Sequence, residues 1–269
     1  MSQSLAVPIV ELQPWFTNLT SCDTQAHGVA TVVTNALRNF GAVIVQDPRV
    51  NLQDFVRPRD LLECYFAQPE HLLTSDMHPD WHYQVGLSPP GAETGRLDIL
   101  DRCTHWAPEH QPHIPHGAYP GDPKLRFFIR LREAVARHAN DHLNRQPVIP
   151  AAFQDIWQPT MNTWGEQLLR VGESVLEMIE TALGIEPGKL RRVTDNAPHL
   201  LGPNAYRFTQ NSTPGTIINL FHSDLNLLTI HGPANYPGLR IWLRNGTSFY
   251  VKIPPGHILV QVGQQLEWL

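Results

Sequence analysis

The chain has 269 residues, of which 42% are hydrophobic and 17% charged, a composition that suits one sizeable globular domain with an ample core. Its net charge of −5 and lack of a basic stripe argue against non-specific nucleic-acid binding, which depends on clustered Lys and Arg. Neither a long apolar segment nor a basic start followed by an apolar run occurs, so we expect no membrane span and no secretory signal. Cys22, Cys64 and Cys103 are odd in number and widely spaced, as expected of reduced thiols in a cytoplasmic protein.

The chain begins with alternating short strands and helices. A strand-like run, Val7-Pro8-Ile9-Val10, comes first. Asp23 can cap a helix that continues to about Asn39, and Gly41 ends that helix. Residues 42–45 then predict a strand, because Ala, Val and Ile follow one another there.

The middle of the chain predicts mainly helices. Residues 60–66 suit a short helix, and residues 75–120, with many prolines, glycines and histidines, predict loops and short strands that border a pocket. A helix is expected over 122–144, because Asp122 can cap it and a proline occupies its first position. A longer amphipathic helix is expected over 163–183, ending at a glycine.

From Leu200 onward the hydrophobic period becomes that of strands. The predicted strands are Asn204–Phe208, Thr216–Asp224, Leu227–His231, Leu239–Leu243, Ser248–Ile253 and His257–Val262. The Asn245-Gly246 pair between two of them predicts a hairpin. Many short antiparallel strands indicate a double-sheet jelly roll, with the earlier helices packed on an outer face.

One predicted strand carries a candidate metal site. His222 and Asp224 are two residues apart, so on a strand both side chains leave the same face. A second histidine would complete the two-histidine, one-carboxylate set that holds non-haem Fe(II). The same pattern recurs at His78-Pro79-Asp80, where the central proline predicts a loop whose side chains need not converge.

Several further pieces of the chain carry a family resemblance in their order and spacing. They are Val7-Pro8-Ile9-Val10, Asn39-Phe40-Gly41-Ala42, Gly121-Asp122-Pro123, Asn204-Ala205-Tyr206, His222-Ser223-Asp224, Leu227-Leu228-Thr229, Gly238-Leu239, Pro254-Pro255-Gly256 and residues 262–267. In these pieces the chain resembles the Fe(II)/2-oxoglutarate-dependent oxygenases related to isopenicillin N synthase. The resemblance implies a mainly β fold with flanking helices, the distorted double-stranded β-helix (jelly roll). It divides the chain into a helical and mixed region (1–120), helical support (121–199) and a core that carries the iron site (200–269).

The resemblance also implies a cytoplasmic enzyme and its site. Iron would be held by His222 and Asp224, and 2-oxoglutarate would be contacted partly by Asn204 and Tyr206. The alternative for Tyr206 is a core aromatic residue with a satisfied hydroxyl group. The implied reaction uses O2 to hydroxylate, desaturate or cyclise a small organic substrate, and the sequence does not choose among these outcomes.

One departure from the family pattern concerns the end of the chain. The family places its second histidine ligand, and then an Arg-x-Ser that binds 2-oxoglutarate, farther from the first histidine than the 47 residues between His222 and Leu269. The expected jelly roll is therefore C-terminally incomplete, and residues 1–269 alone are expected to bind Fe(II) weakly. His257 and His231 are both disfavoured as substitutes, the latter because its odd separation from His222 puts it on the opposite face of a regular strand.

Other histidines and other functions remain open. His138 and His142 are four residues apart on a predicted helix, but the sequence lacks the glutamate of a metalloprotease motif, which makes a solvated helix face the simpler interpretation. Four more histidines line the substrate pocket or decorate a loop: His105, His110, His113 and His116. The alternatives to an oxygenase are a catalytically silent or truncated jelly-roll binding protein and a cupin-type isomerase or metal-binding protein.

Overall fold

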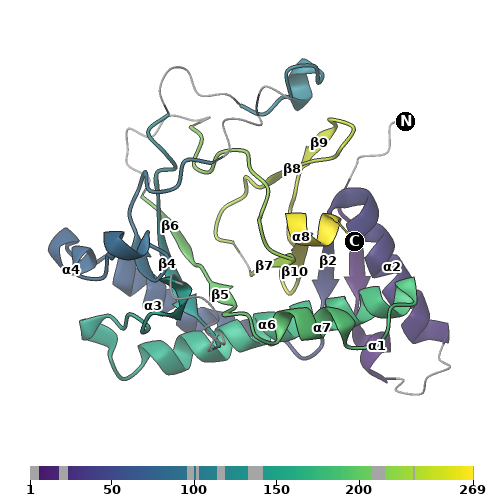
Figure 1. Cartoon of the computed structure of the whole chain (residues 1–269), viewed down its shortest axis with the longest axis horizontal. Coiled ribbons are helices and arrows are strands. Elements are labelled where there is room, and N and C mark those ends of the chain that lie inside the picture. The colour runs from purple at the N-terminus through teal and green to yellow at the C-terminus, as the bar shows by residue number, and fades with distance from the viewer. Residues whose placement is uncertain are drawn as a thin grey trace.

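The computed structural model of the chain describes residues 6–17, 24–95, 100, 103–113, 119–132, 142–207, 216–232 and 234–268. Figure 1 shows these residues as two separate groups of strands above one long helix. Among the described helices, none combines the length and the apolar character that crossing a membrane requires.

The first sheet joins strands from both ends of the chain. Its order is β1 (Ile9–Glu11), β2 (Ala42–Gln46), β10 (Ile258–Val262) and β7 (Leu228–His231). β1 runs parallel to β2, whereas β10 runs antiparallel to both of its neighbours. The strands predicted near residues 7–10, 42–45, 227–231 and 257–262 are thereby confirmed, and they meet only through tertiary pairing.

The second sheet is built around β4 (Lys124–Arg130), which pairs with β3 (Gly86–Ser88), β5 (Leu200–Leu201) and β6 (Asn204–Tyr206). The helix predicted over 122–144 is wrong over residues 122–132, and residues 142–144 form only a 3-10 turn. Residues 133–141, including His138, lie outside the described residues. The alternation of buried residues along this segment explains why it forms a strand. Three alternate residues are buried, namely Leu125, Phe127 and Ile129, whereas Arg126, Phe128 and Arg130, which alternate with them, are half-buried.

A separate hairpin is formed by β8 (Arg240–Trp242) and β9 (Ser248–Tyr250), as Asn245-Gly246 predicts. Gly246 has a φ of +84°, and the Asn245 side chain accepts a hydrogen bond from the Thr247 amide at 2.9 Å. These are the local features that a tight turn between two strands requires.

Helices surround the two sheets. The α-helices are α1 (Gln13–Thr17), α2 (Thr24–Phe40), α3 (Val56–Phe66), α4 (Glu70–Thr74), α6 (Trp157–Leu183), α7 (Lys189–Thr194) and α8 (Gln264–Glu267). Short 3-10 turns occur at Leu52–Phe55, Pro79–Trp81, Pro108–His110, His142–Asn144 and Ala151–Phe153. The predicted ends of α2, α3 and α6 are confirmed, although α3 and α6 begin earlier than expected. Helices account for more described residues than strands do.

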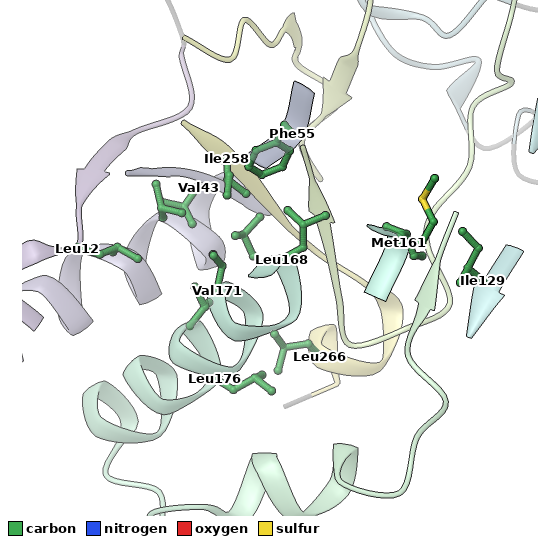
Figure 2. Packing of buried hydrophobic residues seen from close by; sticks show 14 of the residues in the cluster. Leu12, Val43, Phe55, Ile129, Met161, Leu168, Val171, Leu176, Ile258 and Leu266 are labelled. Carbon is green, nitrogen blue, oxygen red and sulfur yellow. The ribbon is translucent and has the colours of Figure 1, made fainter. Parts of the chain in front are cut away.

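The main core lies between α6 and the first sheet. Figure 2 shows Leu168 and Val171 of α6 close to Val43 of β2 and Ile258 of β10. Alternate residues of the same strands face the other way and form a smaller cluster with the hairpin: Val7, Ala42, Ile44, Phe249, Val251 and Leu259. The first sheet is therefore apolar on both faces, which explains why β2 reads as an uninterrupted apolar run.

Leu259→Ala tests whether this second cluster contributes to stability. Leu259 is 0% exposed, so its truncation leaves a cavity, and we expect the free energy of unfolding to fall by about 2–5 kcal/mol. Urea unfolding measures the loss. Leu225→Ala is the matched control, because Leu225 is 69% exposed and its truncation should change stability by less than about 0.5 kcal/mol. Equal losses in the two variants would contradict this assignment of the core.

Candidate active site

His222 and Asp224 lie in an irregular segment, so the strand predicted over Thr216–Asp224 is wrong. Both backbone groups of Leu220 bond to side chains, whereas in a strand they would bond to a neighbouring strand. The Leu220 amide donates to Asp122 Oδ1 at 2.8 Å, and the Leu220 carbonyl accepts from the His222 ring. Burial does not alternate either, because Leu220 is 1% exposed and the next residue, Phe221, packs its ring against Trp242.

The two predicted metal ligands nevertheless face each other. His222 Nε2 lies 3.5 Å from Asp224 Oδ1, with the two side chains 33% and 22% exposed. The other ring nitrogen, Nδ1, is 2.6 Å from the Leu220 carbonyl oxygen. Because a carbonyl oxygen only accepts hydrogen bonds, Nδ1 carries a proton. Nε2 therefore donates to the carboxylate when the ring is protonated, and presents its lone pair there when the ring is neutral.

The surroundings of Asp224 favour its charged form. Burial alone raises the pKa of this carboxyl group, but hydrogen bonds from His222 and Thr229 and the positive charge of nearby histidines outweigh burial and lower the pKa to about 2. The Thr229 hydroxyl donates to Oδ2, which leaves Oδ1 facing His222. The carboxylate in turn raises the pKa of His222.

Asn204 and Tyr206 stand on β6, next to the two cationic side chains of β4. Lys124 is paired in register with Tyr206, and Arg126 with Asn204. Arg126 Nε donates to Asn204 Oδ1 at 2.7 Å, and its NH1 forms an ion pair with Glu93 at 3.0 Å. Burial raises the pKa of Tyr206 above its usual range, so its hydroxyl group keeps its proton and is able to donate.

His231 is the residue that the sequence argument missed. It lies on β7 two residues after Thr229, so both side chains leave the same face of the strand, and Thr229 donates to Asp224. The expectation that His231 faces away from His222 assumed one regular strand between them, and residues 222–227 do not form a strand. Burial lowers the pKa of His231, and its Nε2 is buried with no hydrogen-bond partner. No signal in the sequence could have revealed that His231 lies on the same side as Asp224.

Several of the remaining histidines have contacts of their own. His257 Nδ1 bonds the Pro255 carbonyl, and His78 stacks on Trp81 while Asp80 lies exposed in the Pro79–Trp81 turn, which confirms that the second motif is not on a strand. His110 binds Ser248 of β9 through Nδ1. His113 is exposed, and His116 lies outside the described residues. Within the described ranges, no three His, Cys, Asp or Glu side chains are grouped closely enough to hold a metal ion.

Comparisons with known proteins bear on the fold. No family model matches the chain. A curated relative, the 1-aminocyclopropane-1-carboxylate oxidase homolog 2 of Arabidopsis thaliana, is 26% identical over 168 residues, or 59% of this chain and 45% of the relative. The chain thus spans less than half of that relative's length.

Two solved structures extend the likeness to almost the whole chain. A Caulobacter crescentus 2OG-Fe(II) oxygenase family protein has a TM-score of 0.74 at 18% identity, covering 98% of this chain and 76% of its own. JOX2, solved with 2OG, Fe and JA, has a TM-score of 0.65 at 17% identity, covering 98% and 66%. The chain therefore has the fold of the 2-oxoglutarate and Fe(II) oxygenases, and the predicted resemblance is confirmed.

Thr229→Val tests the electrostatics of Asp224. The change removes the hydroxyl group that donates to Oδ2 but keeps the side-chain shape, so we expect the pKa of Asp224 to rise above about 2. A carboxyl group with a depressed pKa stabilises the fold above its unfolded pKa of about 3.9, and this contribution is lost as the pH falls toward the folded pKa. The variant should therefore be less stable at pH 7, with the difference shrinking below about pH 4.

Carboxyl 13C NMR measures the pKa of Asp224, and urea unfolding measures the stability. Thr229→Ser is the control, because serine keeps a hydroxyl group that can donate. The same Asp224 pKa in the Val and Ser variants would show that this hydrogen bond does not set it.

Proposed function

We propose that the protein is a non-haem Fe(II)- and 2-oxoglutarate-dependent oxygenase that acts on a small organic substrate. The observation that carries this proposal is the 3.5 Å separation of His222 Nε2 and Asp224 Oδ1 inside a fold of this type. One metal ion about 2 Å from each atom fits that separation. The donor set, one imidazole and one carboxylate, is the pair that such Fe(II) sites use, with further positions left for other ligands.

In this proposal His222 and Asp224 hold the metal, and their neighbours orient them. The Leu220 carbonyl keeps the His222 proton on Nδ1, and Thr229 keeps the second oxygen of Asp224 turned away from the metal position. Bound Fe(II), with 2-oxoglutarate as cosubstrate, would supply the reaction with O2. The protein residues bind and orient the reactants.

The proposed contacts to 2-oxoglutarate come from β6. Asn204 and Tyr206 stand on the strand that pairs with β4, and Tyr206 keeps its hydroxyl proton, as a donor to a carboxylate must. Arg126 fixes the orientation of the Asn204 amide, because its Nε donates to Oδ1. The amide nitrogen of Asn204 is then the group turned toward a ligand.

The detailed architecture that we propose is the distorted double-stranded β-helix. The sheet of β1, β2, β10 and β7 would form one wall and the sheet around β4 the other, with the His222 segment between them. Two observations support this arrangement. Figure 1 shows the two groups of strands on either side of the loops, and Asp122, next to β4, bonds Leu220 of the His222 segment.

A second candidate function is a jelly-roll binding protein without catalysis. It is favoured by one observation: the described residues supply two metal ligands, His222 and Asp224, and no group of three. Two ligands hold a divalent ion more weakly than three, so a protein with this pair alone would not retain Fe(II). An anaerobic Fe(II) titration of the full-length gene product separates the two candidates, because only the oxygenase requires binding that depends on Asp224.

Asp224→Ala should abolish 2-oxoglutarate turnover in the full-length gene product, because it deletes the anionic ligand. We expect the rate of O2-coupled succinate formation to fall by at least about 100-fold. Asp80→Ala is the matched control, since Asp80 belongs to the other His-x-Asp motif and is exposed, and it should leave the rate within about two-fold. Comparable losses in both variants, or undiminished turnover in Asp224→Ala, would overturn the site assignment.

A further inference from the structure

A buried cluster of polar side chains lies next to the segment that carries His222. Its centre is the ion pair of Asp122 and Lys124, whose side chains are each 2% exposed and whose Oδ2 and Nζ atoms are 3.0 Å apart. Lys124 Nζ also donates to Asn219 Oδ1 at 2.6 Å and contacts Glu93 Oε2 at 2.9 Å. These partners compensate the cost of removing two charges from water.

The second oxygen of Asp122 connects the cluster to the candidate metal site. Asp122 Oδ1 accepts hydrogen bonds from the Leu220 amide at 2.8 Å and from the Tyr119 hydroxyl at 2.5 Å. The carbonyl of the same Leu220 accepts from His222 Nδ1 at 2.6 Å. A single residue of main chain therefore links the buried carboxylate to the imidazole.

We infer that Asp122 is a positioning residue for His222. Its carboxylate fixes the main chain at Leu220, and the fixed Leu220 carbonyl in turn sets both the ring orientation and the nitrogen that carries the proton. With the proton on Nδ1, the lone pair of the neutral ring lies at Nε2, on the side of Asp224. The consequence for metal affinity rests on the proposed function, whereas the effect on the ring does not.

The test has to separate this role from the stability that the ion pair gives. A single change at Asp122 leaves the charge of Lys124 buried without its carboxylate, which can prevent folding. Two double variants avoid this problem because both remove the two charges: Asp122→Asn with Lys124→Met, and Asp122→Leu with Lys124→Met. Asparagine keeps an oxygen that accepts from the Leu220 amide, and leucine, of similar shape, does not.

The first measurement is the 15N NMR signature of the His222 ring in the metal-free protein, assigned with His222→Gln and recorded where the ring is neutral. The Asn-containing variant should keep the proton on Nδ1, as the unchanged protein does. The Leu-containing variant should show a mixture of both tautomers, because the Leu220 carbonyl is no longer held in place. A residue that only supports the fold would not move this signature.

The second measurement is the Co(II) affinity of the full-length gene product, with Co(II) in place of Fe(II) to avoid oxidation. We expect the Asn-containing variant to bind within about three-fold of the unchanged protein, and the Leu-containing variant to bind about 10–100-fold more weakly. Asp47→Asn is the control for loss of a buried carboxylate. Asp47 is 0% exposed at its side chain and is paired with Arg49 at 2.6 Å, so its loss should lower stability without changing either readout.

Each outcome decides a different point. Equal tautomer populations and equal Co(II) affinities in the two double variants would overturn the positioning role. An equal loss of Co(II) affinity in both double variants would overturn it as well. A tautomer shift confined to the Leu-containing variant, in a protein that binds neither Co(II) nor Fe(II), would support the positioning role and defeat the proposed function.

Discussion

The buried ion pair of Asp122 and Lys124 joins the parts of the molecule on which the candidate site depends. It stands at the start of β4, and its two side chains reach Asn219 and the Leu220 amide in the segment that leads to His222. Removing such charges from water is unfavourable unless every charged atom finds a partner. This requirement limits how the second sheet and the His222 segment can be arranged relative to one another.

Neighbouring charges and burial also set the protonation states of the site residues. Asp224 remains ionised because His222 and Thr229 donate to it, although burial opposes its charge. His231 experiences the reverse balance, since burial favours its neutral form and the charge of Asp224 opposes that effect. One imidazole beside one carboxylate is a pair of donors suited to a cation or to a polar ligand.

The first sheet supplies the rigid support. β10 lies between β2 and β7, and α6 covers one face of this sheet with a continuous apolar surface. β7 carries Thr229 and His231, so both side chains next to Asp224 come from a strand that the core holds in place. The irregular segment with His222 has no strand pairing among the described residues, and hydrogen bonds of its own side chains, of Asp122 and of Gln264 hold it instead.

The sequence by itself determined the features that depend on neighbouring residues. The period of 3.6 and the terminal glycines located α2 and α6, and Asn245-Gly246 located the hairpin. The sequence also indicated that His222 and Asp224 lie together, but on a strand that the structure does not form. Two local signals conflict at β4, because Leu125, Phe127 and Ile129 alternate as in a strand whereas Asp122 and the following proline resemble the start of a helix. The pairing of β4 with β3, β5 and β6 decided between them. It also decided that residues 216–227 leave the sheet and that His231 approaches Asp224. These outcomes depend on partners far away in the sequence, such as Asp122 for Leu220, and a local hydrophobic period contains no information about such pairs.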